Sequence, residues 1–183
     1  MGAMRMGYLY VGSTLFAAAL SCTQRVPEPK PELVIEKYVD GAPSRIVWME
    51  RGVPDGLDVL LHPNGQVARL TSWRSGVRTG MSKSFHEEGQ LLEQGAYVDG
   101  HRDGLWIAYY PSGAILAETY LCNGLRVDQF RQWHDNCFLK VLGAFRDDER
   151  HGEWIFFDER GKPARYETYD QGVLMGSRVL QGR

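Results

Sequence analysis

Histidines with acidic neighbours are the residues of this 183-residue chain most suited to chemistry. His101 stands just before Asp103, and His151 follows the acidic run at 147–149. An imidazole beside carboxylates could ligate a metal ion or transfer protons. No nucleophile stands at a fixed spacing from either histidine, and the acidic run lacks the alternating ligands of a dedicated calcium loop. We therefore predict no catalytic residue, no metal site and no cofactor. The acidic run is expected to be a solvated loop, with a weak calcium site as the alternative.

The other three histidines, His62, His86 and His134, are separated by 24 and 48 residues. This interval is that of an internal repeat, and equivalent residues of neighbouring repeats lie roughly 10 Å apart if each repeat contributes two strands. The ligands of one zinc ion must converge to within about 2 Å of it. These histidines therefore cannot share a metal ion, and we expect them to face solvent.

A 24-residue repeat organises most of the chain. Five full units span residues 52–171, and half-units at 37–51 and 172–183 flank them, as capping repeats do in tandem arrays. The first place of successive units holds Gly52, Gly76, Gly100, Gly124, Asp148 and Gly172. Glycine also recurs at the fifth and fourteenth places, where Asp128 and Cys137 are the exceptions within the full units. We expect residues 37–183 to form one repeat domain.

Each unit is predicted to form one β-hairpin. Its two apolar runs, such as 105–110 and 114–121, are too short for helices and rich in β-branched and aromatic residues. A three-residue loop such as 63–65 joins them, with glycine in the left-handed position. This loop pairs the tenth place with the sixteenth, and we expect these places and the twenty-second to form the main buried face. The predicted fold class is all-β: an elongated, twisted antiparallel sheet of tandem 24-residue hairpins.

The seventh place is expected on the face opposite this main buried face. It changes along the chain from Asp58 and Ser82 to aromatic rings, and clustered exposed aromatic side chains mark interaction sites. We therefore predict a partner-binding surface on the last three units. Its candidate residues are Trp106, Phe130, Trp154, Phe156, Leu142 and Tyr166. The alternative is that sheet curvature, or packing of the N-terminal segment, buries these rings in the core.

Two units carry a recognisable set of glycines and aromatic residues. These are Gly100, Gly104, Trp106, Tyr109, Tyr110 and Gly113 in one, and Gly152, Trp154, Phe157 and Gly161 in the other. The pattern resembles the MORN repeat, in the bacterial variant of YwqK-family antitoxins, over residues 37–183. Asp58 and Ser82 depart from it where the family has tryptophan. The resemblance implies a scaffold of hairpin repeats and, through the antitoxin family, a role in neutralising a toxin.

The N-terminal segment has the features of a secretory signal. A basic Arg5, an apolar stretch at 8–20 and small residues before Cys22 fit a signal peptide over residues 1–21. The apolar stretch is too short to span a membrane as a helix. The ending at 19–22 resembles a lipobox, which implies that Cys22 is lipidated. Cleavage by an ordinary signal peptidase at the same bond and an uncleaved anchor are the alternatives.

The residues that follow suit a lipoprotein of the bacterial envelope. Alternating prolines favour an extended tether over residues 22–36. By resemblance to bacterial lipoproteins, Thr23 implies the outer membrane. We expect a location in the bacterial cell envelope, facing the periplasm or the exterior.

Two cysteines lie within the repeats. Cys122 is expected at the end of a second strand, and Cys137 in the turn at the far end of the next strand. They should be about 23 Å apart, whereas a disulfide needs Cα atoms within about 7 Å. We expect them not to pair.

The charge balance narrows the class of partner. The chain has 21 basic and 23 acidic residues, which supply no basic cluster for nucleic acid or lipid headgroups. We therefore predict a non-catalytic, lipid-anchored scaffold that binds a protein or an envelope component, with a homodimer as one form of such binding. The alternative is an antitoxin or immunity lipoprotein that neutralises a specific toxin.

Overall fold

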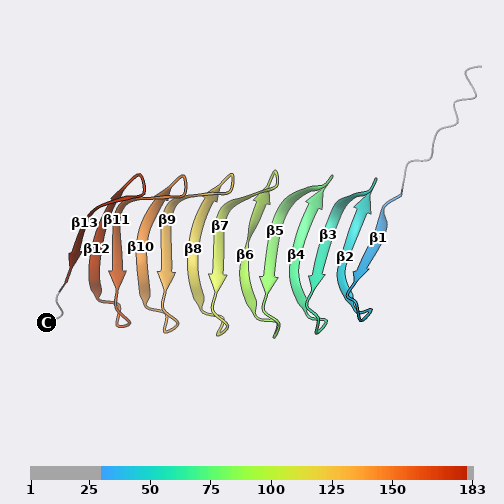
Figure 1. Ribbon diagram of the computed structural model, residues 1–183, viewed down its shortest axis with the longest axis horizontal. Helices are drawn as coiled ribbons and strands as arrows, with labels where there is room; N and C mark the ends of the chain where they lie inside the picture. The colour runs from blue at the N-terminus through green and yellow to red at the C-terminus, as the bar shows by residue number, and fades with distance from the viewer. Residues whose placement is uncertain (1–29, 181–183) are drawn as a thin grey trace, which may run out of the picture. The chain divides into compact units, whose positions relative to one another are not determined.

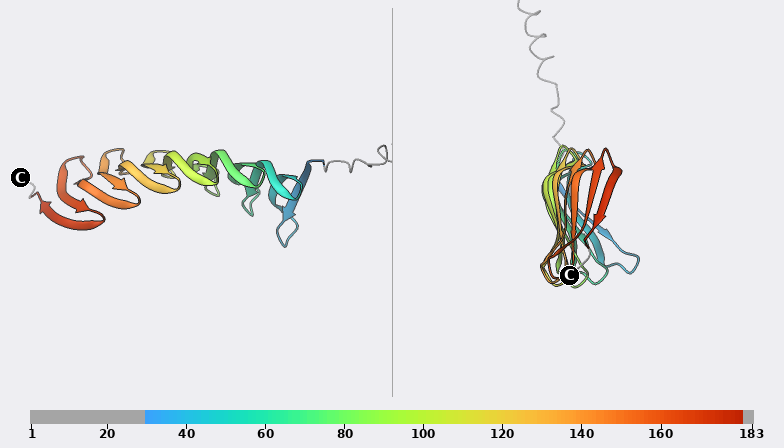
Figure 2. Two further views of the ribbon diagram at one scale, coloured as in Figure 1. Left: turned by 90° about the horizontal axis from the view of Figure 1, so that it is seen from above. Right: turned by 90° about the vertical axis from the view of Figure 1, so that its left-hand side faces the viewer.

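The computed structural model describes residues 30–180, which form one open sheet of thirteen antiparallel strands in chain order (Figure 1). The strands are β1 (Glu32–Lys37), β2 (Pro43–Glu50), β3 (Val53–Leu61), β4 (Val67–Arg74), β5 (Val77–Phe85), β6 (Leu91–Val98), β7 (His101–Tyr109), β8 (Ile115–Cys122), β9 (Leu125–Trp133), β10 (Leu139–Arg146), β11 (Glu149–Phe157), β12 (Pro163–Asp170) and β13 (Val173–Val179). No helix occurs between residues 30 and 180, and the sheet is twisted (Figure 2). The predicted all-β sheet of tandem hairpins is confirmed.

A three-residue loop closes the hairpin inside each full repeat, as predicted. In the first unit the backbone N–H of His62 donates to the Gln66 carbonyl (2.8 Å), and the Gly65 N–H donates to the His62 carbonyl (2.9 Å). Gly65 has a φ of 82°, which glycine adopts without a Cβ clash. Cys137 takes the same place in the fourth unit with a φ of 66°, so its backbone is strained.

Two-residue turns connect consecutive repeats. Asp99 and Gly100 both have positive φ (48° and 84°), which is the type I′ turn favoured between antiparallel strands. The Gly100 N–H donates to the Arg78 carbonyl (3.0 Å), and equivalent bonds form at the start of the later units. These bonds hold neighbouring hairpins in the same register at this end of the strands.

A bulge beside each three-residue loop decides which side chains share a face. Leu61 pairs with Val67 as expected, but the next pair is Leu60 with Arg69, so Ala68 is left out of the ladder. An extra residue on one strand changes the alternation of faces beyond it. The seventh place therefore shares a face with the twenty-second, and the expectation that it faces away is wrong.

We call this shared face the tryptophan face. It carries the seventh, eighteenth, twentieth and twenty-second places, as in β7 and β8, where Trp106 pairs with Thr119 and Gly104 with Leu121. The eighth and nineteenth places lie on the opposite face, because the side chains of adjacent residues in a strand point to opposite sides.

The sheet begins earlier than expected. Ile35 of β1 pairs with Ile46, and Leu33 with Trp48, so the first strand starts at Glu32 rather than at residue 37. The last residues of the expected tether at 22–36 are therefore part of the sheet. The expected signal peptide at 1–21, Cys22 and residues 23–29 lie outside the described residues.

Candidate binding face

The tryptophan face buries the rings that the sequence suggested were exposed. Trp154 is 1 % and Trp106 5 % exposed, and Val141 and Phe145 form a buried cluster with Trp154. The expected exposure of both tryptophans is therefore wrong, and the alternative in which these rings belong to the core describes them better.

Neighbouring rings cover one another along the last three units. Phe130 stacks on Trp154 with ring centroids 5.7 Å apart, and Phe145 meets the same indole edge-on at 5.0 Å. Tyr169 approaches Trp154 from the next strand at 6.3 Å. Such pairs stabilise by about 0.5–1.5 kcal/mol each beyond area burial. The rings therefore form a core on one side of a single sheet.

Arginines complete the cover over these rings. The guanidinium carbon of Arg102 lies 3.9 Å from the Trp106 ring centroid, and that of Arg150 lies 4.5 Å from the Trp154 centroid. A guanidinium over a ring face is attracted by the ring quadrupole and keeps its charge in water. A single-layer sheet can hide large rings in this way because arginine serves as the second layer.

Arg102 is also held by an acid on the preceding hairpin. Its two terminal nitrogens donate to the Glu93 carboxylate at 2.7 and 2.8 Å. Burial lowers the pKa of Arg102, but the bonds to Glu93 and Tyr97 outweigh burial, so the pKa is raised overall. The guanidinium stays charged and fixed over its ring.

A hollow of about 410 Å³ opens in the aromatic core at the C-terminal units. Phe130, Trp154 and Phe156 line it, so the structure brings three of the predicted binding residues together. The charged side chains in its wall are Arg126, Lys140 and Arg150. The hollow thus combines aromatic walls with cationic groups.

The other predicted binding residues lie elsewhere. Trp106 lines a separate, smaller hollow of about 170 Å³. Leu142 and Tyr166 both pair with Ile155, at the eighth place, and therefore lie on the face opposite Trp154. The expectation that they share a face with Trp154 is wrong, because it took no account of the bulge in each hairpin.

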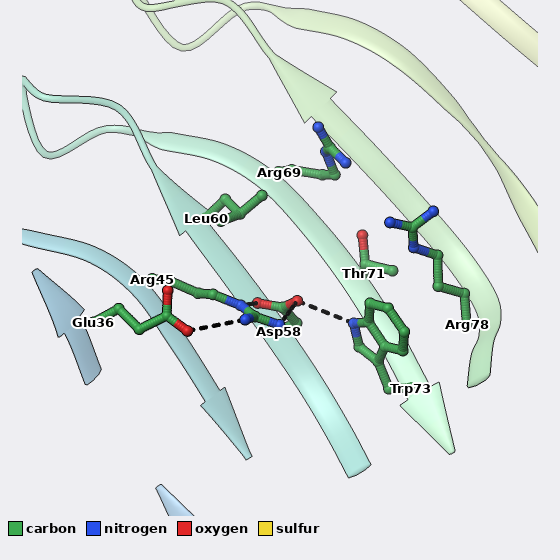
Figure 3. A pocket seen from close by; sticks show the side chains of 8 residues that line it. All are labelled: Glu36, Arg45, Asp58, Leu60, Arg69, Thr71, Trp73 and Arg78. Atoms are coloured by element: carbon green, nitrogen blue, oxygen red, sulfur yellow. Dashed lines mark hydrogen bonds and ion pairs between the residues drawn. The ribbon is translucent and has the colours of Figure 1, made fainter. Parts of the chain in front are cut away.

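A second large hollow, of about 350 Å³, lies at the N-terminal units (Figure 3). Asp58, which replaces the ring of the seventh place, lines it, and Ser82, at the seventh place of the next unit, hydrogen-bonds to Thr71 of its wall. Asp58 is only 6 % exposed, and its two oxygens accept from Arg45 (both 2.9 Å) and from the Trp73 indole N–H (3.0 Å). The hydrogen bond to Asp58 raises the pKa of Arg45. Sequence reasoning noted both substitutions but missed the hollow, although the loss of a large ring from a repeat was the available signal.

Two of the three histidines at the eleventh place join adjacent hairpins, whereas the Nε2 of His86 is buried with no hydrogen-bond partner among residues 30–180. The ring nitrogen Nε2 of His62 lies 3.0 Å from the Phe85 carbonyl oxygen, and that of His134 lies 3.3 Å from the Phe157 carbonyl oxygen. Tyr110 at the equivalent place donates its hydroxyl to the Trp133 carbonyl (2.8 Å). These side chains are half-buried, so the expectation that the histidines face solvent is wrong, and the contacts of His62 and His134 are structural.

Residues 30–180 hold no group of three or more His, Cys, Asp or Glu side chains arranged to bind a metal ion. They also contain no helix long and apolar enough to cross a membrane. Cys122 and Cys137 are exposed free thiols, one at the end of β8 and the other in the loop after β9.

Three hairpins match a known repeat. Residues 78–99, 102–123 and 150–171 each match the model of the MORN repeat variant, and they correspond to β5–β6, β7–β8 and β11–β12. No curated protein matches the chain. The repeat character expected from the sequence is thus supported at three of the five full units.

Proposed function

We propose that this array of MORN-type hairpins is a non-catalytic scaffold that binds a protein partner through its tryptophan face. In such arrays each repeat contacts only its neighbours, which leaves a long continuous face for recognition. The proposal includes attachment to the bacterial envelope through a lipid on Cys22, which the signal-like order of residues 1–22 suggests.

The C-terminal hollow is the observation that carries the binding proposal. Phe130 and Phe156 are half-buried beside it, and the cations Arg126 and Arg150 contribute to its wall. Aromatic and arginine side chains around a pocket are the usual centre of an interface. Trp154 also lines this hollow, while its indole Nε1 is buried with no hydrogen-bond partner among residues 30–180. A partner that inserts an apolar side chain among these rings would fit the hollow.

Filling the hollow tests this proposal. Gln132 lines it, whereas the exposed Gln129 of the same strand lies on the opposite face. Gln132→Trp should block the partner, and Gln129→Trp adds the same ring where no contact is expected.

The readout is recovery of proteins bound to the full chain from solubilised envelope. Wild type and Gln129→Trp should retain one partner that Gln132→Trp loses, at an unchanged melting temperature. Retention by Gln132→Trp would refute binding at this hollow. Identification of the recovered partner as a toxin would assign the immunity role.

A further inference from the structure

Two arginines meet on the tryptophan face where the next repeat has an arginine and an acid. Arg102, at the third place of its unit, binds Glu93, at the eighteenth place of the preceding unit. One repeat earlier these two places hold Arg78 and Arg69. Neither of these arginines forms an ion pair with any residue between 30 and 180. Like charges therefore occupy the position at which the next repeat has the bidentate Glu93–Arg102 ion pair.

Both arginines line the N-terminal hollow. Figure 3 shows their guanidinium groups on the same side of it, beyond Thr71 as seen from Asp58. The guanidinium carbon of Arg78 lies 5.1 Å from the Trp73 ring centroid and 5.5 Å from that of Tyr97. Contact with two rings restricts Arg78, so less side-chain freedom is lost when a ligand binds.

The acids of the hollow are already bound by a third arginine. Asp58 accepts from Arg45 at 2.9 Å, and Glu36 accepts from the same guanidinium at 3.0 Å. The lining therefore contains three arginines against two acids, with the excess positive charge on Arg69 and Arg78. This charge is complementary to an anion.

We propose that Arg69 and Arg78 bind a side-chain carboxylate from an acidic segment of the partner. The carboxylate would take the position that Glu93 takes beside Arg102 in the next repeat, and a guanidinium binds it through two parallel hydrogen bonds. Thr71 lines the hollow and hydrogen-bonds to Ser82, which stands where the next repeat has the large Trp106, so no ring fills this place. The inference rests on the proposed function and adds the chemistry of a second contact on the same face.

Placing the carboxylate within the chain tests this inference. Arg69→Glu recreates the Glu93–Arg102 pair one repeat earlier, so it should compete with any external carboxylate. The probe is a fluorescent hexaglutamate peptide, with hexaglutamine as the neutral comparison, added to the full chain. Arg69→Glu should bind hexaglutamate about tenfold more weakly or worse. Its melting temperature should rise by about 2 °C, since an ion pair replaces two like charges.

Arg74→Glu is the matched control. It makes the same change of charge on the same strand, at an exposed position outside the hollow. It should leave hexaglutamate binding unchanged. Equal weakening in both variants would overturn the inference, because it would show a general effect of charge.

Two further outcomes would also overturn it. One is binding of inorganic phosphate or anionic phospholipid vesicles, lost in Arg69→Glu, with no binding of hexaglutamate. The other is equal binding of hexaglutamine and hexaglutamate. Gln132→Trp should still bind hexaglutamate, so failure at this site and failure at the C-terminal hollow can be told apart.

Discussion

Gly143 of β10 leaves the space that the Trp154 ring of β11 occupies: a Cβ built on Gly143 would lie 2.3 Å from an indole carbon. Gly95 and Trp106 repeat this relationship at 2.2 Å. Such separations are shorter than real carbon contacts, so neither glycine can gain a side chain while the ring stays in place. The size of the twentieth-place side chain therefore limits the size of the ring on the next strand.

Gly143→Ala should therefore destabilise the protein by roughly 1–3 kcal/mol, because the indole ring must move out of a packed core. Gly176→Ala is the control, since Gly176 has nothing within 4 Å of a built Cβ and does not have positive φ. Urea unfolding measures both. Equal stability of Gly143→Ala and wild type would contradict the packing described.

The pair Thr119 and Phe130 suggests a rescue. These residues face each other across β8 and β9. Compared with Gly143 and Trp154, the twentieth-place side chain is larger and the seventh-place ring is smaller. Gly143→Thr combined with Trp154→Phe copies that pair, so it should be more stable than Gly143→Thr alone. Independent, additive effects of the two substitutions would show that they are not coupled.

Cys137 should be replaceable by glycine with a gain in stability. Its φ of 66° is the conformation that glycine provides at the same place in the other full units. Relief of this strain should stabilise the protein by about 1 kcal/mol. Cys122→Ala, at an exposed strand position, should change stability far less. The midpoint of urea unfolding under reducing conditions compares the two, and no gain from Cys137→Gly would argue against a strained turn.

The ionised carboxylate of Asp148 should make the folding stability of the protein fall at acid pH. The Arg126 side chain donates to its carboxylate at 2.7 Å and the Arg126 backbone N–H at 3.0 Å, and these bonds lower the pKa of Asp148 below 3.8. A carboxyl group with a lowered pKa stabilises the fold above its ordinary pKa, and this contribution is lost as pH falls through the lowered value. Because Asp148 is well exposed, the effect should be small.

Asp148→Gly separates this ion pair from backbone strain. Asp148 and Asp128 both have positive φ, at 69° and 56°, so glycine should relieve strain at either place. At pH 7 only Asp148→Gly also loses the Arg126 contact, so Asp128→Gly should be the more stabilised variant. The difference in melting temperature between the two should shrink as pH falls below 4. A constant difference would show that the contact with Arg126 adds nothing.

Cys22 should carry the lipid anchor. In cells given a fatty-acid analogue, the wild-type protein should be labelled. Cys22→Ala should be unlabelled, because it lacks the cysteine to which the lipid would be attached. Cys122→Ala, which removes an exposed cysteine of the sheet, should label like wild type. Equal labelling of Cys22→Ala and wild type would remove the anchor from the proposal.

The sequence predicted the hairpins well because each depends on local geometry. The loop at 63–65 and the pairing of Leu61 with Val67 follow from a glycine in the left-handed position and from strand alternation. Spacing alone could therefore identify β2–β13, their order and their direction, but not β1, which precedes the repeats.

The assignment of faces failed because a bulge has no strong signature in the sequence. Nothing in the sequence around Ala68 distinguishes an unpaired residue from a paired one, yet this residue puts Trp73 on the same face as Asp58 rather than on the opposite face. The packing of Arg102 and Arg150 over the tryptophan rings could not be predicted from the sequence either, because it depends on the conformations of long side chains.

The most direct test of binding at the C-terminal hollow is photocrosslinking at its wall. A photoreactive amino acid placed at Gln132 should capture one envelope protein in living cells, whereas the same amino acid at Gln129 on the opposite face should not. Capture at Gln132 that Phe156→Ala reduces would support a partner seated among these rings. Equal capture from both positions, or capture from Gln129 alone, would contradict a binding site on the tryptophan face.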